Sequence, residues 1–215
     1  MRLLAPVIRG LLFLALAHAL PAAPATTALL TSPDFAGWEF VTTPAVALTS
    51  VATLSPDGVL TLTGKPTGYL ATTTVHENYR LHVEWRWTAQ PGNGGVLVHI
   101  NSGPKDRAWP ECFQIQTKHR ATGDLLPMAG AAFAEPLTSA PGAAPQIRAH
   151  TAADSEKPAG EWNSADITCR GDTLEVVING VKQNLVTGTS LARGRIGFQF
   201  EGAPFALRHV TLTPL

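Results

Sequence analysis

The chain has 215 residues, and its 16 basic and 16 acidic side chains give a formal net charge of zero. This balance excludes the broad basic surface that is expected of a nucleic-acid-binding protein. Because 45% of the residues are apolar and 15% are charged, the composition is not that of a disordered chain or a coiled coil. The 19 glycines and 17 prolines, together with frequent Thr and Val, favour an all-β protein with many turns.

Residues 1–25 have the pattern of a secretory signal peptide. Arg2 and Arg9 accompany an apolar run over Leu11–Ala17, and Ala17-His18-Ala19 is a small-residue cleavage motif. Cleavage is expected between residues 19 and 25. The apolar run is too short to span a bilayer, so we expect a periplasmic or secreted protein that has no membrane contact once the signal is removed.

Short segments with strand character recur between turn signals in the rest of the chain. They are Val59–Thr63, Tyr69–Val75, Tyr79–Trp87, Gly95–Ile100, Cys112–Lys118, Ala165–Arg170, Thr173–Ile178, Arg195–Phe200 and Phe205–Leu212. Asn179-Gly180 is typical of a two-residue hairpin turn, because both positions tolerate a positive φ. This spacing predicts one domain over residues 30–215, folded as a two-sheet antiparallel β-sandwich.

Residues 119–160 form a long segment that is rich in Ala, Pro and Gly and has little periodicity. Long loops inside compact domains are usually functional or mobile. We expect this loop to pack over one rim of the sandwich, either as a lid or as an insertion without a role.

Cys112 and Cys169 are the only cysteines. An exported location would permit a disulfide between them. Two buried free thiols are an equally good interpretation of the sequence.

Alternation along three of the strand segments separates polar from apolar side chains. If these strands share one sheet, a single polar face carries Glu84, Arg86, His99, Gln114, Gln116 and Lys118. Amide and guanidinium groups suit sugar hydroxyls, which both donate and accept hydrogen bonds. A solvated sheet face without a function would show the same alternation.

Two tryptophans, Trp109 and Trp162, lie beside loops, where an aromatic ring can stack on a sugar or belong to the core. The common signatures of serine hydrolases, P-loop proteins, zinc proteases and dinucleotide-binding proteins do not occur.

Seven motifs resemble, in the same order, the 3-keto-disaccharide hydrolase domain family, which is similar to concanavalin A-like lectins and glucanases. They are Leu81–Trp87, Gly92–Leu97, Trp109–Cys112, Gly160–Asn163, Cys169–Asp172, Val177–Gly180 and Gly194–Gln199. The resemblance extends from about Trp38 to Leu215. It implies a jelly-roll sandwich with a sugar-binding face, and cleavage of glycosides that carry a ketone at C3 of the sugar.

This chemistry needs a base, a group that stabilises an enolate, and a proton donor for the leaving oxygen. The resemblance implies Glu84, His99 or His119 as the base, and Arg86 or Lys118 at the enolate, where a divalent metal ion is a further option. The expected substrate-binding residues are Arg86, Gln114, Gln116, Trp109, Trp162, Asn163 and Gln199.

Two positions depart from the family pattern. The family commonly has an arginine near the position of His99. Gln114 stands where the family commonly has Glu, and a glutamine cannot act as a base. The leading hypothesis is therefore an exported enzyme that acts on 3-keto-glycosides, and the alternative is a non-catalytic carbohydrate-binding module of the same fold.

Overall fold

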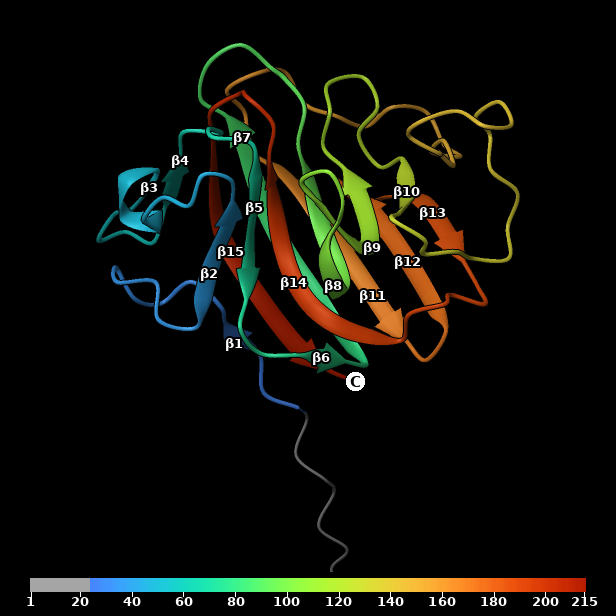
Figure 1. Cartoon of the computed structure of the whole chain (residues 1–215), viewed down its shortest axis with the longest axis horizontal. Coiled ribbons are helices and arrows are strands. Elements are labelled where there is room, and N and C mark those ends of the chain that lie inside the picture. The colour runs from blue at the N-terminus through green and yellow to red at the C-terminus, as the bar shows by residue number, and fades with distance from the viewer. Residues whose placement is uncertain (1–23) are drawn as a thin grey trace, which may run out of the picture.

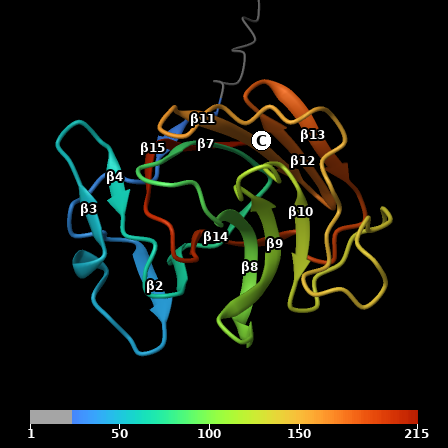
Figure 2. The same ribbon diagram turned by 90° about the horizontal axis from the view of Figure 1, so that it is seen from above.

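The computed structural model describes residues 24–215, which form two antiparallel β-sheets packed face to face (Figure 1, Figure 2). The elements are β1 Thr27–Ala28, β2 Trp38–Thr42, the short 3-10 helix η1 Leu48–Ser50, β3 Ala52–Leu54, β4 Leu60–Leu62, β5 Gly68–Thr72, β6 His76–Glu77, β7 Tyr79–Trp87, β8 Gly95–Asp106, β9 Trp109–Gln116, β10 Leu125–Met128, β11 Asn163–Arg170, β12 Thr173–Ile178, β13 Val181–Val186, β14 Arg193–Phe200 and β15 Phe205–Pro214.

The eight-stranded sheet has the order β13-β12-β11-β7-β15-β4-β3, with β1 paired to β15. The seven-stranded sheet has the order β10-β9-β8-β14-β5-β2, with β6 paired to β14. Each segment that alternation identifies as a strand is a strand in the structure. The predicted antiparallel jelly-roll sandwich is confirmed.

The main core lies between the two sheets. Along β7, Leu81, Val83 and Trp85 are buried at 2% exposure or less, while the residues between them are more exposed. They pack in one cluster with Phe113 and Ile115 of the other sheet. The alternation in the sequence therefore correctly identifies which face of β7 is buried.

The seven-stranded sheet is also buried on its outer face. Leu70 belongs to the main core, whereas its neighbours Tyr69 and Ala71 join a second buried cluster with Leu97 and Cys112. Neighbouring side chains on a strand point to opposite faces, so this second cluster lies on the outside of the sheet. Figure 2 shows β8 and β9 curving away from the other sheet on this side.

The predicted hairpin turn joins β12 to β13. Asn179 and Gly180 have φ values of 50° and 81°, and Ile178 pairs with Val181. Both residues adopt the left-handed conformation that a tight two-residue turn requires.

The long segment 119–160 runs along the rim beside β9 and β10 (Figure 1). It contains β10, which pairs with β9, and Leu125 also forms a bridge with Arg148. The segment is thereby tied back to the seven-stranded sheet.

The two cysteines are free thiols on different faces. Cys112 lies in the outer cluster, and Cys169 lies in the main core. Burial raises the pKa of the Cys169 thiol to about 12. Of the two interpretations that the sequence allows, the structure has the buried free thiols.

The predicted signal peptide lies outside the described residues, apart from residues 24 and 25. Within residues 24–215, no helix has the length and apolar character needed to cross a membrane.

Candidate active site

The outer face of the seven-stranded sheet contains a cavity of about 450 Å³. This volume is within the range of about 300–1,000 Å³ that is usual for small-molecule sites. Its walls come from β9, β10, the end of β14, the tip of the β8–β9 hairpin and the 119–160 segment. The site therefore combines a sheet floor with loops at its rim.

A row of paired residues crosses the sheet beneath this cavity. Asp124 lies beside Gln116, whose N–H donates to the Asp124 carbonyl, and Gln116 pairs with Gly95. Since Val96 pairs with Phe198, Gly95 lies opposite Gln199. Gly95 has no side chain to fill the centre of the cavity, and the Gln114 side chain packs directly over it. A Cβ at this position would lie 2.6 Å from Gln114 Cγ.

Three buried amides line the cavity from β9 and β14. Gln114, Gln116 and Gln199 are 1%, 5% and 3% exposed. Gln114 Nε2 donates to Gln116 Oε1 at 2.6 Å, but the Oε1 atoms of Gln114 and Gln199 accept no hydrogen bond from any residue in 24–215. A buried acceptor without a partner costs about 1–3 kcal/mol, so these two oxygens are suited to accept ligand hydroxyl groups.

Glu201 is a titratable group in the same cavity that the sequence interpretation missed. Its Oε2 accepts a 2.7 Å hydrogen bond from Asn93 Nδ2. Burial raises the pKa of the Glu201 carboxyl above its ordinary value, against the opposing positive charges of Lys118 and Arg107. Glu201 follows Gln199 by two residues, and this spacing could have placed both on one face.

Lys118 and Trp109 lie on the cavity, as the sequence analysis expects. His119 does not line it. The His119 ring is bonded to Glu156 at 3.0 Å near the rim.

Glu84 and Arg86 do not share a face with the three glutamines, so the single polar face expected from the sequence is wrong. Both lie on β7, which belongs to the eight-stranded sheet. Alternation identifies the face of a strand but not the sheet that it joins. The polar side of β7 therefore lies on the opposite outer surface of the sandwich.

Glu84 forms an ion-pair cluster on that opposite surface. Its carboxylate accepts from Arg208 Nε at 2.5 Å and lies 3.0 Å from His209 Nδ1. Burial by itself would raise the pKa of Glu84, but the hydrogen bonds and charges of His209 and Arg208 hold it below its ordinary value. Glu84 is thus a paired structural carboxylate and not the base of the cavity.

Trp162 and Asn163 also lie away from the cavity. The guanidinium carbons of Arg86 and Arg208 are 4.7 and 4.2 Å from the Trp162 ring centre, so cations occupy the ring surface. The side chain of Asn163 holds a loop, accepting from the Lys157 N–H and from Asn179 Nδ2, each at 2.8 Å. The structure gives both residues packing roles.

His99 is buried in the core, contrary to the prediction that it lies on the polar face. It has a φ of 54°, and the pairing of β8 shifts register at this point. The bulge turns His99 inward, with its ring centre 5.9 Å from Tyr79 and 6.3 Å from Phe113, and turns Ile100 outward. Burial lowers the pKa of His99, against a hydrogen bond to the Leu191 carbonyl.

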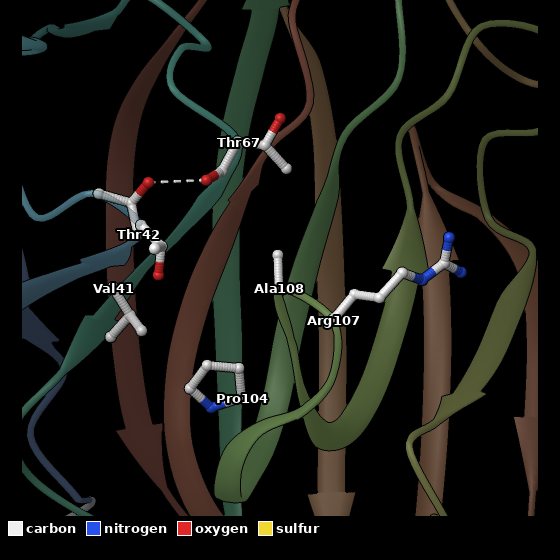
Figure 3. A pocket seen from close by; sticks show the side chains of 7 residues that line it. Val41, Thr42, Thr67, Pro104, Arg107 and Ala108 are labelled. Carbon is white, nitrogen blue, oxygen red and sulfur yellow. Dashed lines mark hydrogen bonds between the residues drawn. The ribbon is translucent and has the colours of Figure 1, made fainter.

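A second, smaller hollow of about 200 Å³ lies between β2, Thr67 and the tip of the β8–β9 hairpin (Figure 3). Arg107 lines both hollows. Figure 3 shows its side chain running away from Thr42 and Thr67. The hairpin tip therefore separates the two hollows, and Arg107 is the residue that they share.

The residues present do not form a metal site. Asp106, Asp124 and Glu201 all line the main cavity, but nowhere in residues 24–215 do three His, Cys, Asp or Glu side chains gather to hold a metal ion.

The model of the 3-keto-alpha-glucoside-1,2-lyase-like domain matches residues 26–213. The chain belongs to this family. The lyase-like domain thus covers nearly the whole described chain, in agreement with the resemblance found in the motifs. A search of curated proteins gives no match.

Solved structures share the fold of this lyase-like domain. A candidate glycosyl hydrolase from Parabacteroides distasonis has a TM-score of 0.64 at 20% identity, covering 89% of this chain and 100% of that one. The β-glucanase of Bacillus licheniformis has a TM-score of 0.58 at 9% identity, covering 91% and 100%. A carbohydrate-binding module from Bacillus subtilis has a TM-score of 0.58 at 9% identity, covering 82% and 95%.

Proposed function

We propose that the lyase-like domain cleaves glycosides whose sugar carries a ketone at C3, by elimination followed by hydration. The observation that carries the proposal is the combination, in one cavity, of buried amide oxygens without partners and a carboxyl whose pKa is raised. The family match supports the choice of substrate.

The ketone makes this chemistry accessible without the two-carboxylate mechanism of ordinary glycosidases. A C3 carbonyl acidifies the hydrogen on C2, and the leaving group on C1 is then β to the carbonyl. A base removes the C2 proton, the electron pair forms an enolate and then the C1–C2 double bond, and the C1–O bond breaks as the leaving oxygen takes a proton. Water then adds at C1 and a proton returns to C2, so the net reaction is hydrolysis.

Glu201 is suited to the acid role. A carboxyl with a raised pKa stays protonated closer to neutral pH and can give its proton to the leaving oxygen. The Lys118 ammonium supplies the positive charge that stabilises an enolate oxygen. Gln114 and Gln199 accept hydrogen bonds from sugar hydroxyls, and Trp109 offers an aromatic wall for the ring.

The test is incubation of the purified domain with a 3-keto-glucoside and, in parallel, with the same glucoside before oxidation. We expect release of the leaving group, together with a keto-glycal or the free 3-keto-sugar, only from the oxidised compound. Mass spectrometry and ultraviolet absorbance detect these products. Absence of release from 3-keto-glycosides of both anomers would contradict the proposal.

The alternative is a carbohydrate-binding module without turnover. The amide-rich lining favours it, because glutamines bind hydroxyls but cannot act as bases. Saturable binding of the same 3-keto-glucoside without product would support this function.

We also propose that the protein is exported, on the basis of the predicted signal peptide over residues 1–25. Expression of the full chain in a bacterial host, followed by fractionation and N-terminal sequencing, tests this. A mature N-terminus between residues 20 and 26 in the periplasm or medium is expected, and an intact Met1 in the cytoplasm would contradict it.

A further inference from the structure

The geometry points to Asp124, held in place by His150, as the base that removes the C2 proton. This inference rests on the proposed function, because it fills the role that Glu201 leaves open there. No residue of the sequence-based candidate set fills that role inside the cavity. Glu84 and His99 lie elsewhere, and His119 is bonded to Glu156 outside the lining.

Asp124 lies on the opposite side of the cavity from Glu201. The row runs from Asp124, which directly precedes β10, across Gln116 of β9 and Gly95 of β8 to Gln199 of β14, and Glu201 follows Gln199 by two residues. Three strand spacings of about 4.8 Å separate the two sides by about 14 Å at the main chain. With glycine at the centre of the floor, side chains reaching in from both sides leave room for one sugar ring.

The Asp124 carboxylate is fixed in orientation by the 119–160 segment. Its Oδ1 accepts the His150 backbone N–H at 2.9 Å and lies 2.6 Å from His150 Nδ1. Among residues 24–215, no hydrogen bond involves Asp124 Oδ2. One oxygen is therefore held while the other remains available to accept a proton from a ligand.

Asp124 is buried in the wall of the cavity and is paired there with His150. The residue is 8% exposed and lines the same cavity as the unpartnered Gln114 and Gln199 oxygens. Aspartate is rarely buried unless it is paired, and an orienting histidine is the arrangement that fixes a catalytic base for proton transfer. His150 acts through Asp124 and is a positioning residue.

In the balanced step, Asp124 Oδ2 takes the C2 proton, and the C2–H electron pair moves into the enolate of the C3 ketone. The enolate then expels the C1 oxygen, which receives the proton of Glu201. The base and the acid thus act on separate bonds, and the two roles can be measured separately.

The experiment follows two readouts in D₂O, exchange of the C2 hydrogen by NMR and release of the leaving group. Two substrates are compared, a 3-keto-disaccharide and a nitrophenyl 3-keto-glucoside, whose phenolate leaves without a proton. We expect Asp124→Asn to lose at least about 100-fold in C2 exchange and in release from both substrates. Glu201→Gln should lose a similar factor on the disaccharide but less than about fivefold on the nitrophenyl compound.

Variants of His150 test its positioning role. They also test the inference if the Asp124→Asn variant does not fold. His150→Phe removes the ring N–H donor and should lower C2 exchange between about 10-fold and 100-fold with little change in KM. His150→Asn, which keeps an N–H donor near the Nδ1 position, should restore most of it.

C2 exchange within about twofold of wild type in either Asp124→Asn or His150→Phe would overturn the inference. Equal losses for Asp124→Asn and Glu201→Gln on both substrates would also overturn it, because the separate roles would then be absent. Wild-type protein that shows neither exchange nor release would instead refute the proposed function itself.

Discussion

Both outer faces of the sandwich carry polar side chains, but these side chains are satisfied on one face and unsatisfied on the other. On the eight-stranded sheet, Glu84 is bonded to Arg208 and His209, and the charges neutralise one another. On the seven-stranded sheet, Gln114 and Gln199 are buried, and their side-chain oxygens accept no hydrogen bond within the described part of the chain. The face with satisfied charges is a stable surface, whereas the face with unsatisfied amides is prepared for a ligand.

Among the predictions that compare the two faces, the largest expected effect comes from adding a side chain to the cavity floor at Gly95. A Cβ at Gly95 would meet the Gln114 side chain at 2.6–2.9 Å, so Gly95→Ala should push that amide out of place. A displacement of about 1 Å can cost about 100-fold in rate, and we expect a loss of this size in kcat/KM. A circular dichroism spectrum and a melting curve close to wild type are the controls. Unchanged kcat/KM would show that Gln114 does not contact the substrate.

A second prediction compares one amide from each sheet. Gln199→Met removes an unpartnered buried oxygen, so it should lower kcat/KM about tenfold with no loss of stability. Asn163→Ala removes the oxygen that accepts two hydrogen bonds of 2.8 Å and should cost about 2 kcal/mol in the free energy of unfolding with unchanged kcat/KM. Urea unfolding and steady-state kinetics measure both. The reverse outcome would place the site on the eight-stranded sheet.

The third prediction concerns pH. If Glu201 is the acid, it must be protonated, so the rate should fall as the pH rises through the pKa of Glu201. Burial raises this pKa, and the positive charges of Lys118 and Arg107 lower it. Lys118→Ala removes one of these charges, so the pKa should rise and the basic limb of kcat should move to higher pH. Lys182→Ala, which breaks a pair with Glu175 on the other sheet, is the matched control and should leave the profile unchanged.

The smallest effect is expected at Glu84. Its pKa is lowered in the folded state, so its ion pairs stabilise the fold above the unfolded pKa and lose this contribution as pH falls through the folded pKa. Glu84→Gln should therefore cost about 1 kcal/mol near pH 7, and the difference from wild type should shrink in acid. Urea unfolding at several pH values measures it. A difference that stays constant or grows as the pH falls into the acid range would contradict this assignment.

The sequence predicts the fold better than the site, for physical reasons. Alternation identifies strands and their buried faces, as β7 shows, because side chains take opposite sides by geometry. It does not identify the sheet that a strand joins, so Glu84 and Gln114 were expected on one face and lie on two.

Local irregularities account for the other differences. The bulge at His99 adds a residue to β8 and reverses the faces after it. β10 lies inside a segment without clear periodicity, so neither this strand nor Asp124 beside it could be placed from the sequence. The two-residue spacing between Gln199 and Glu201 was sufficient to predict Glu201 as a site residue. The predicted strand, however, ended at Phe200, one residue before it.

The most direct test of the central claim is release of the leaving group from a 3-keto-disaccharide by wild type, Glu201→Gln and Glu84→Gln in one assay. If the seven-stranded sheet holds the active site, wild type and Glu84→Gln release product at rates within about twofold, and Glu201→Gln is slower by at least about 100-fold. Full activity of Glu201→Gln together with loss of activity in Glu84→Gln would contradict the account.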